Sequence, residues 1–320
     1  IMKNIYSNIF KFNKKNHIKS IISLKKNNVI GLPTETVYGL AGNAYSLKAV
    51  KKIYKLKKRP SFNPLIIHYH SLKDAKKDIE VNNSLLQLYK KFCPGPITFV
   101  LKKRKNTKIN KLTSLRLDTV AIRFPSNLTI RKILKKLNFP LAIPSGNISS
   151  GISPVSAQDV AEEFKKKLSF IIDGGISKIG IESTVVDLSS KIKILRPGII
   201  SSKEISKVLK KKVKNVKHHR SIKAPGALKF HYSPGIPIKM NAKNSLKNHA
   251  FIIFGKRYKN TTNSFNLSKK SNLNEAAKNL YKIFRKIKKL RYKKINIVKI
   301  PNKEVGIAIN DRIKKASGTK

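Results

Sequence analysis

The first two hundred residues alternate between segments with helical spacing of apolar side chains and segments with the composition of strands, and this alternation constrains the fold most. Residues 17–26 are helical in pattern and lead into the strand-like V-I-G-L, and residues 43–58 form a second helical segment before P-L-I-I-H-Y. Such alternation predicts an α/β domain. Further strands are expected at I-T-F-V-L-K, T-V-A-I-R-F, P-L-A-I-P, S-F-I-I-D, S-T-V-V-D-L and K-I-K-I-L-R.

Small and turn-forming residues gather where these strands end. Gly, Pro, Ser or Asn follows many of the expected strands immediately. In open α/β sheets, ligands usually bind at the loops that follow the strands. The sequence therefore predicts a ligand site built from these loops.

The rest of the chain reads as a closing helix, a connector and a second, smaller unit. Residues 201–212 are helical in pattern, and residues 214–237 are basic and held extended by Pro225, Pro234 and Pro237. Beyond them come a strand, H-A-F-I-I-F, a long amphipathic helix over 272–290, a strand, I-N-I-V-K-I, and a terminal helix over 303–316. A β-α-β-α unit of about eighty residues buries little apolar surface by itself, so we expect it to pack against the first domain.

Length and composition agree with a two-domain globular protein. At 320 residues the chain is longer than most single domains. No apolar run approaches the roughly 18 residues that span a bilayer, and the opening I-M-K-N-I-Y-S-N-I-F-K-F is too polar for a secretory signal. We expect a cytoplasmic protein without membrane insertion. The single cysteine, Cys93, excludes an internal disulfide framework and a cysteine-based zinc site, and we interpret it as a packing or turn residue.

The formal net charge of +56 allows two interpretations. Taken alone it indicates a nucleic-acid partner. Lys, Asn and Ile are all abundant, however, as A/T-rich codon usage would produce, and the lysines are spread along the chain as on a solvated surface. An RNA-binding module is thus the main rival to an enzyme; it predicts salt-sensitive RNA affinity without ATP turnover. RNP-like aromatic strands and a zinc knuckle are absent from the sequence, which disfavours it.

Nucleotide-binding glycine loops are missing, since neither G-x-x-x-x-G-K-[ST] nor a G-x-G-x-x-G after a strand occurs. Six polar clusters remain. The first, G-L-P-T-E-T-V-Y-G-L over residues 31–40, either grips a small polar ligand or is a turn capped by threonines. The second, K-K-R-P-S-F-N-P-L-I-I-H, places a lysine and an arginine beside two prolines. It is either a pre-ordered triphosphate site or a solvated helix end.

The third cluster, L-D-T-V-A-I-R-F-P, puts Thr119 and Arg123 on one face of a strand. A buried arginine there needs an anionic partner, and a substrate carboxylate would serve. The fourth, P-S-G-N-I-S-S-G-I-S-P, offers N–H groups and hydroxyls to phosphate oxygens. The fifth and sixth are G-I-E-S-T-V-V-D and L-R-P-G. Of only 15 acidic residues, five fall in or beside these clusters and are candidates for magnesium: Glu35, Asp118, Asp173, Glu182 and Asp187.

Each cluster is a weak signal by itself. Taken together, the order of the clusters and their residues closely resemble the Sua5/YrdC family over about residues 14–210. The stretch A-P-G-A-L-K-F-H-Y-S-P resembles the linker of the long Sua5 form, and N-E-A-A-K-N-L-Y with A-I-N-D-R-I-K-K-A-S-G resembles its C-terminal domain. The resemblance implies a YrdC-like twisted mixed sheet flanked by helices over 14–210, a linker or lid over 211–240, and a small Rossmann-like α/β C-terminal domain over 241–320.

The activity that this resemblance implies is that of an L-threonylcarbamoyladenylate synthase, a nucleotidyltransferase. It would convert L-threonine, bicarbonate and ATP into threonylcarbamoyl-AMP and pyrophosphate, for N6-threonylcarbamoyladenosine in tRNA. Magnesium is expected to enter with ATP. The expected partners are a downstream tRNA threonylcarbamoyl transferase complex and, weakly, tRNA or other RNA, including double-stranded RNA. A related carbamoyl-transfer module of hydrogenase maturation would need zinc-finger cysteines, which a single Cys93 rules out.

Site residues follow from the resemblance position by position. The family's K-x-R and S-x-N signature falls on Lys57, Arg59, Ser145 and Asn147, which are the expected catalytic residues. Lys58, Gly146 and Asn127 depart from the residues usual in the family, without removing a group that the chemistry needs. If Tyr232 packs on the nucleotide, residues 223–237 must cover the site, and truncation beyond about residue 222 should weaken nucleotide binding. The expected ATP contacts are Arg59, Asn63, Thr119, Ser145, Ser153, Arg196 and Tyr232, and the expected threonine contacts are Thr36, His68, Arg123 and Ser183.

Overall fold

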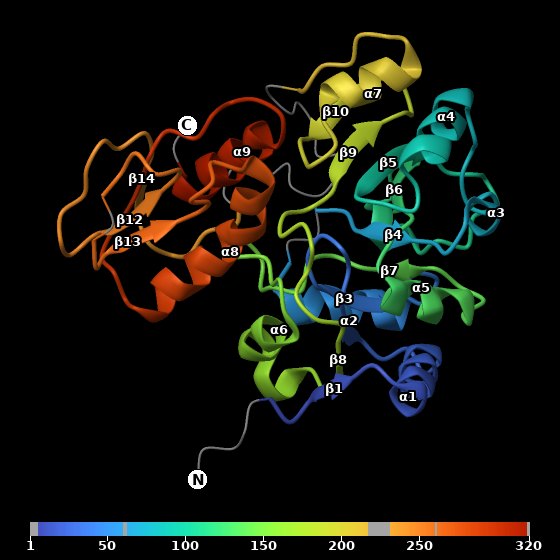
Figure 1. The fold of residues 1–320 in the computed structure, drawn as a ribbon. Helices are drawn as coiled ribbons and strands as arrows, with labels where there is room; N and C mark the ends of the chain where they lie inside the picture. The colour runs from blue at the N-terminus through green and yellow to red at the C-terminus, as the bar shows by residue number, and fades with distance from the viewer. Residues whose placement is uncertain (1–5, 60–62, 217–230, 260, 319–320) are drawn as a thin grey trace.

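Two β-sheets organise the chain. The structure is a computed structural model that describes residues 6–59, 63–216, 231–259 and 261–318. A ten-stranded sheet lies in the part up to residue 216, the large unit, and a four-stranded sheet lies in residues 238–318, the small unit. Residues 231–237 are the joining segment. Figure 1 shows the small unit, orange to red, beside the large one. The predicted α/β fold class, a mixed sheet flanked by helices with a small second α/β part, is confirmed.

The large sheet is mixed and runs in the order β1-β8-β2-β3-β7-β4-β6-β5-β9-β10. Its pairs β1/β8, β2/β8, β4/β6 and β5/β9 are parallel, and the others are antiparallel. The strands are β1 (Ile9–Lys11), β2 (Ile30–Leu32), β3 (Gly39–Asn43), β4 (Ile66–His68), β5 (Ile97–Lys102), β6 (Thr119–Arg123), β7 (Leu141–Ala142), β8 (Ile171–Asp173), β9 (Thr184–Asp187) and β10 (Lys193–Arg196).

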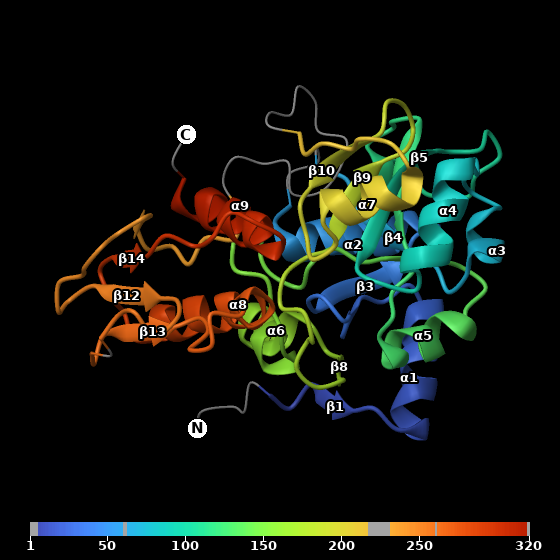
Figure 2. The ribbon, with the colours of Figure 1, turned by 45° about the horizontal axis from the view of Figure 1, so that its top comes forward.

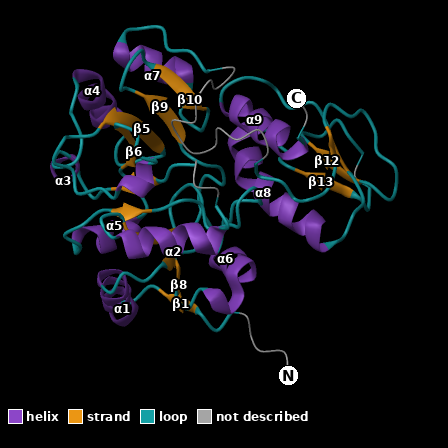
Figure 3. Ribbon diagram, turned by 180° about the vertical axis from the view of Figure 1, so that it is seen from behind, coloured by secondary structure: helices purple, strands orange, loops and turns teal. Residues whose placement is uncertain are grey.

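Helices cover both faces of this sheet because its strands are apolar on both sides. Along β3 and β8, neighbouring residues join opposite layers: Leu40 and Ile171 belong to one core cluster, and Ala41 and Ile172 to another. The first layer contains α2 (Leu47–Lys57), α4 (Asn83–Phe92), α6 (Ala157–Phe164) and α7 (Ser202–Leu209). The second contains α1 (Lys14–Lys25) and α5 (Leu128–Lys135), and Figure 3 shows the helices from behind. One short helix, α3 (Leu72–Ala75), and two 3₁₀ turns (Lys111–Ser114, Lys165–Lys167) complete the unit.

Helix α2 begins later than its sequence pattern predicts. The Ser46 side chain accepts a hydrogen bond from the Ala49 amide and so caps the helix at Leu47. The expected start at residue 43 is wrong because residues up to Asn43 extend the unpredicted strand β3. Cys93 ends α4 and packs against the large core, in agreement with its interpretation as a packing or turn residue.

One face of the half-sheet β4-β6-β5-β9-β10 carries only a small apolar cluster. Ile66, Val100, Ala121, Val185 and Leu195 form it, and within the described residues no helix contributes to it. Ala121 stands between Thr119 and Arg123 along β6, which share its face by strand alternation, as predicted. This face is therefore where polar groups of the large sheet are accessible for a site.

The small unit is a four-stranded parallel sheet in the order β11-β14-β12-β13. The two predicted strands and helices are present as β12 (Ala250–Ile253), α8 (Leu273–Lys289), β14 (Ile295–Ile297) and α9 (Val305–Ser317); β11 (Ile238–Lys239) and β13 (Ser264–Asn266) were not predicted. Helices α8 and α9 lie between the small sheet and the large unit (Figures 1 and 2). Their core continues into Val37, Ile152, Val155 and Ile181, so the two units share apolar packing.

Among the described helices, none combines the length and the apolar character that a membrane crossing requires. The expected linker or lid over 211–240 lies partly outside the described residues, which omit 217–230.

Candidate active site

A polar pocket opens where loops of the large unit meet the joining segment. The loop between β2 and β3, the end of α2, strands β4 and β6, and the loop after β7 contribute to it. The loop before β9, the end of β10 and residues 231–232 close it from the other sides. Its polar side chains are Thr34, Thr36, Tyr38, Arg59, His68, Arg123, Ser145, Glu182, Arg196, His231 and Tyr232.

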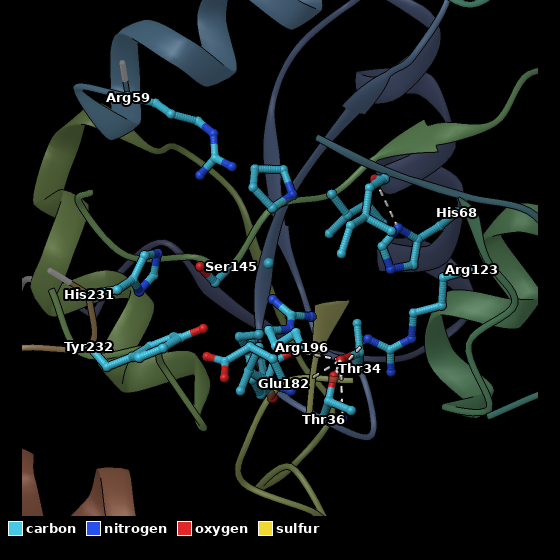
Figure 4. A pocket seen from close by; sticks show the side chains of 16 residues that line it. Thr34, Thr36, Arg59, His68, Arg123, Ser145, Glu182, Arg196, His231 and Tyr232 are labelled. Atoms are coloured by element: carbon cyan, nitrogen blue, oxygen red, sulfur yellow. Dashed lines mark hydrogen bonds between the residues drawn. The ribbon is translucent and has the colours of Figure 1, made fainter. Parts of the chain in front are cut away.

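The polar groups divide the pocket into two halves (Figure 4). On one side lie Arg59, Ser145, His231 and Tyr232, and on the other lie Thr34, Thr36, His68 and Arg123, with Glu182 and Arg196 between them. Among the lining residues, those expected to contact nucleotide thus lie mainly in one half and those expected to contact threonine in the other, and Arg196 lies between the two halves.

Arg123 anchors the second half. Its Nη2 pairs with Glu35 Oε1 at 2.6 Å, and its Nη1 donates to Thr36 Oγ1 at 2.8 Å. Thr34 Oγ1 contacts Thr36 Oγ1 at 2.8 Å, which ties the loop together. The anionic partner that the sequence reasoning required is therefore Glu35, within the same chain. The buried Arg123 Nε atom has no hydrogen-bond partner among the residues that the structure describes, which leaves this N–H for a bound anion.

His68 ends β4 beside Arg123. Burial lowers the pKa of its imidazole well below the usual value, and the neighbouring Arg123 charge lowers it further. The Nδ1 atom lies 3.3 Å from the Ile66 carbonyl oxygen. The ring is therefore neutral near pH 7 and suits a polar ligand as a hydrogen-bonding group rather than as a cation.

Arg196 and Ser183 form one unit at the centre of the pocket. The guanidinium donates from Nε to the Ser183 carbonyl and from Nη2 to Ser183 Oγ, both at 3.1 Å. Ser183 Oγ also contacts Thr98 Oγ1 at 2.8 Å. Ser183 itself is fully buried beneath Arg196, so it orients the arginine that reaches the pocket.

Arg59 follows α2 and is held by backbone carbonyls. Its Nε donates to the Asn63 carbonyl and its Nη2 to the Pro64 carbonyl, both at 2.8 Å. Burial lowers the pKa of this guanidinium to about 10, so it stays charged near pH 7. A charged group held in this way is suited to phosphate oxygens.

Lys57 does not line the pocket as described but shapes the loop that does. Its Nζ donates to the carbonyls of Ser145, at 2.6 Å, and of Asn147. Burial lowers the pKa of its ammonium group well below the usual value, and Arg59 adds to the effect. The Asn147 side chain in turn donates to the Ile148 and Gly151 carbonyls at 2.7 and 2.9 Å. The K-x-R and S-x-N residues are thus brought together in the fold.

Glu182 is a lining residue that the sequence interpretation placed only among magnesium candidates. It accepts hydrogen bonds from Ser153 Oγ, from Tyr281 Oη and, at 2.9 Å, from Arg312 Nε. Burial raises the pKa of this carboxyl group, but the charges of Arg312 and Arg196 outweigh burial and lower it to about 2. Glu182 is therefore an ionised group in the pocket.

The joining segment contributes Tyr232, as expected, and also His231, which was not predicted. Burial lowers the pKa of His231 to about 3 and raises that of Tyr232 to about 12, so both are neutral near pH 7. The Tyr232 hydroxyl points into the pocket in Figure 4. A signal for His231 exists in the sequence, since it precedes Tyr232 within the linker-like H-Y-S-P.

Six expected site residues are buried but do not line the pocket as described. Several of them support lining residues through hydrogen bonds. Thr34 and Tyr38 are further lining residues that the sequence interpretation placed in a cluster but gave no role. The six are Lys57, Asn63, Thr119, Asn147, Ser153 and Ser183.

Unsatisfied polar atoms gather around the pocket. Buried polar atoms nearly always have a hydrogen-bond partner in folded proteins. Within the part of the chain that the structure describes, three buried atoms of lining residues find no partner: Arg123 Nε, His231 Nδ1 and Tyr232 Oη. The buried Oδ1 atoms of Asn63 and Asn147 likewise have no hydrogen-bond partner among the described residues. Groups of this kind are suited to a polar ligand that supplies the missing bonds.

Carboxylates do not assemble into a metal-binding set here. Within the ranges that the structure describes, no three His, Cys, Asp or Glu side chains gather as metal ligands. Near the pocket, Glu35 is paired with Arg123 and Glu182 with Arg312. This donor set does not fit a magnesium ion held by the protein alone.

The chain is similar to characterised proteins along nearly its whole length. The Sua5_yciO_yrdC family model, described as telomere recombination, matches residues 23–198, and the model of the threonylcarbamoyl-AMP synthase C-terminal domain matches residues 200–318. The threonylcarbamoyl-AMP synthase of Pyrococcus abyssi is 34% identical over 318 residues, 92% of each chain. That of Bacillus subtilis is 32% identical over 92% of this chain and 91% of its own. The crystal structure of P. abyssi Sua5 complexed with L-threonine has a TM-score of 0.87 at 32% identity, covering 97% of both chains.

Proposed function

Because the chain belongs to the Sua5/YrdC family, we propose that it is a threonylcarbamoyl-AMP synthase that acts on L-threonine, bicarbonate and ATP. The observation that carries the proposal is the two-sided pocket. One half presents Arg59, Ser145 and Tyr232, and the other presents Thr36, His68 and Arg123. A half with the charged Arg59, beside a half in which neutral hydrogen-bonding groups accompany the Arg123–Glu35 ion pair, suits a nucleotide next to a small amino acid.

The proposed reaction has two steps. The threonine amine first combines with bicarbonate, losing one water, to give N-carboxythreonine. A carbamate oxygen then forms a bond to the α-phosphorus of ATP while the bond from that phosphorus to the bridging oxygen breaks, releasing pyrophosphate. Because carbamate is already anionic near neutral pH, the second step needs position and charge neutralisation more than a general base.

Arg59 and Arg196 would neutralise the phosphate charge in this scheme. Arg59 stays charged although buried, and Arg196 lies between the two halves of the pocket. Both guanidiniums are oriented by hydrogen bonds to backbone carbonyls before any ligand arrives. Lys57 would act indirectly, by holding the carbonyls on either side of Gly146 so that the loop presents Ser145 to the nucleotide.

In the threonine half, Arg123 would bind the ligand through an N–H group that its protein partners do not use. Its Nε finds no partner in the described ranges, while its other nitrogens are held by Glu35 and Thr36. A threonine carboxylate there would satisfy Nε, and the neutral His68 and Thr34 would offer hydrogen bonds to the amine and hydroxyl. The buried site would also protect N-carboxythreonine from water.

Magnesium enters this proposal as part of the substrate. The carboxylates near the pocket are already paired with arginines, so the phosphates of ATP would supply most of the ion's ligands. When bound, the ion would reduce the charge on the triphosphate, and no step of the proposal depends on it.

The product defines the partners that we propose. Threonylcarbamoyl-AMP is an activated acyl donor, and a tRNA threonylcarbamoyl transferase complex would consume it. We place the reaction in the cytoplasm, where a chain with a single cysteine needs no disulfide. The formal charge of +56 also supports weak, salt-sensitive attraction to tRNA or other RNA, double-stranded RNA included, without making RNA a substrate.

The test is a reconstituted reaction. Purified protein is incubated with Mg·ATP and L-threonine in buffer purged of carbon dioxide, with or without added bicarbonate. Mass spectrometry then detects threonylcarbamoyl-AMP, and a coupled assay detects pyrophosphate. We expect product only when threonine and bicarbonate are both present, and less with L-serine.

An Arg196→Gln variant serves as the matched inactive protein, since it keeps polarity but removes the charge between the two halves of the pocket. Pyrophosphate release that needs neither threonine nor bicarbonate would reject the proposal. So would tight, salt-dependent RNA binding in a protein that turns over no ATP, which would favour an RNA-binding module.

A further inference from the structure

Arg312 is a guanidinium of the small unit that reaches into the large one. It lies on α9 and is fully buried. Its Nε donates to Glu182 Oε2 at 2.9 Å and its Nη1 to the Pro197 carbonyl at 2.9 Å, and Nη1 also pairs with Asp311 Oδ2 at 2.7 Å. Glu182 lines the pocket, and Pro197 directly follows the lining residue Arg196. One side chain thus links α9 to two walls of the proposed active site.

The same guanidinium supports the Tyr232 ring. Its Cζ lies 5.2 Å from the ring centroid, within cation–π range. The ring also stacks on Tyr281 of α8 at 5.9 Å and 28°, and the His231 ring lies tilted against it at 4.0 Å. Tyr232 has a φ of 67°, an uncommon conformation for a residue with a side chain. A backbone conformation of this kind persists only where the surroundings hold it.

Backbone hydrogen bonds of the residues on either side of Tyr232 also fix its position. The His231 amide donates to the Lys315 carbonyl of α9 at 3.2 Å, and the Ser233 amide donates to the Ser150 carbonyl of the large unit at 2.9 Å. Tyr232 is therefore fixed by α9 from one side and by the loop that carries Ser145 from the other.

Glu182 depends on the small unit as well. Both Tyr281 of α8 and Arg312 of α9 donate to its carboxylate. The loop before it packs directly on α8: a Cβ on Gly180 would come within 2.5 Å of the Lys278 Cα. The Gly180 amide then donates to the Thr36 carbonyl at 3.1 Å, which continues the contact into the threonine half.

From these contacts we propose that Arg312 is a positioning residue of the nucleotide half: it holds the Tyr232 ring and the Glu182 carboxylate in place, so that docking of the small unit completes the pocket. This inference rests on the proposed function for its consequence, weaker nucleotide binding, but not for its structural part. The alternative is that Arg312 only holds the two units together without positioning the pocket. Arg285 of α8 already makes such a contact between the units, by pairing with Glu163 of α6 at 3.1 Å.

Matched Arg→Lys variants separate the two roles. Arg312→Lys keeps the positive charge beside Glu182, but one ammonium cannot reproduce the planar contact with Tyr232 and the bonds to Glu182 and Pro197 together. Arg285→Lys makes the same chemical change in the other arginine that links the units. Both variants are expected to fold, which circular dichroism and thermal unfolding will check.

The first readout is hydrogen exchange without ligand, followed by mass spectrometry of peptides that cover residues 231–236. We expect exchange at least about tenfold faster there in Arg312→Lys than in wild type, and unchanged in Arg285→Lys. If Arg312→Lys is too unstable, the double variant Glu182→Gln/Arg312→Gln, which leaves no unpaired buried charge, takes its place for this readout. Equal exchange in the two Arg→Lys variants would overturn the inference.

The second readout is calorimetric titration, in the presence of L-threonine, with Mg·AMPCPP, the α,β-methylene analogue of ATP, because the proposed reaction breaks the bond between the α-phosphorus and its bridging oxygen. We expect the Kd to rise about tenfold or more in Arg312→Lys and to stay within about twofold in Arg285→Lys. A wild type that binds the nucleotide, with Arg312→Lys binding it equally well, would overturn the inference. A wild type that binds no Mg·AMPCPP while exchange still responds to Arg312→Lys would reject the proposed function and leave the anchoring of Tyr232 intact.

Discussion

The Lys57 ammonium lies 2.6 Å from the Ser145 carbonyl oxygen and so joins the end of α2 to the loop after β7. Lys57 belongs to the K-x-R signature and was expected to be catalytic, but this contact makes it a support for the loop, and its side chain does not line the pocket. The consequences of this contact can be measured.

Replacement of Lys57 by methionine should loosen the loop. Two buried carbonyls, those of Ser145 and Asn147, would lose their donor, at a cost of about 1–3 kcal/mol in the free energy of unfolding. The KM for ATP should rise because Ser145 is no longer held in place. Lys55→Met, on the exposed face of the same helix, is the control and should change neither quantity. Denaturant unfolding and steady-state kinetics provide the two measurements, and equal results for both variants would contradict this role.

Arg123→Lys should impair threonine binding selectively. A lysine cannot pair with Glu35, reach Thr36 and still offer a third donor to a ligand. We expect the KM for L-threonine to rise at least about tenfold, a loss of about 1.4 kcal/mol, with a much smaller change for ATP. Arg131→Lys is the matched control, since Arg131 is likewise held by hydrogen bonds, to the backbone carbonyls of His70 and Pro125, but does not line the pocket. A parallel rise in both KM values for Arg123→Lys would argue against a threonine-specific role.

Gly180→Ala should destabilise the protein more than Gly175→Ala. Both glycines have positive φ, 84° and 77°, so each alanine pays a similar backbone cost of about 1–2 kcal/mol. A Cβ at Gly175 meets open space, whereas one at Gly180 meets the backbone of α8 at Lys278. We expect at least about 3 kcal/mol of lost unfolding free energy for Gly180→Ala, measured by denaturant titration. Similar losses for the two variants would show that α8 moves aside without resistance.

Acid should destabilise the protein partly through His231. In the folded state the pKa of His231 is lowered to about 3 by burial, whereas an unfolded histidine takes up a proton near 6.5. The unfolded state therefore binds more protons as the pH falls from about 6.5 toward 3, and stability decreases across that window. At pH 5 the contribution is about 2 kcal/mol. His231→Gln should lose about that much less stability than wild type between pH 7.5 and 5. Parallel losses in both proteins would contradict a buried neutral His231.

Local sequence patterns predicted much of the fold because they depend on neighbours in the chain. The long apolar stripe of α8 and the strand-like A-F-I-I of β12 are visible without a structure. Strand β3, G-L-A-G-N, is not, because its glycines have no preference for a strand. Close packing selects them instead: a Cβ on Gly39 would lie 2.3 Å from the Ile143 side chain. The short strands β11 and β13 are likewise strands because β14 and β12 offer them partners.

The sequence by itself also determined the family and, through it, most residues of the candidate site, since side-chain types in a fixed order carry that information. Only the tertiary structure decided what each residue touches. Glu182 and Arg312 are 130 positions apart, and their pairing depends on how the small unit docks. Glu35 as the partner of Arg123, and the Tyr232 ring between Arg312 and Tyr281, follow in the same way from topology. Such contacts cannot be read locally, because a buried charge is satisfied by whichever partner the complete fold brings within reach.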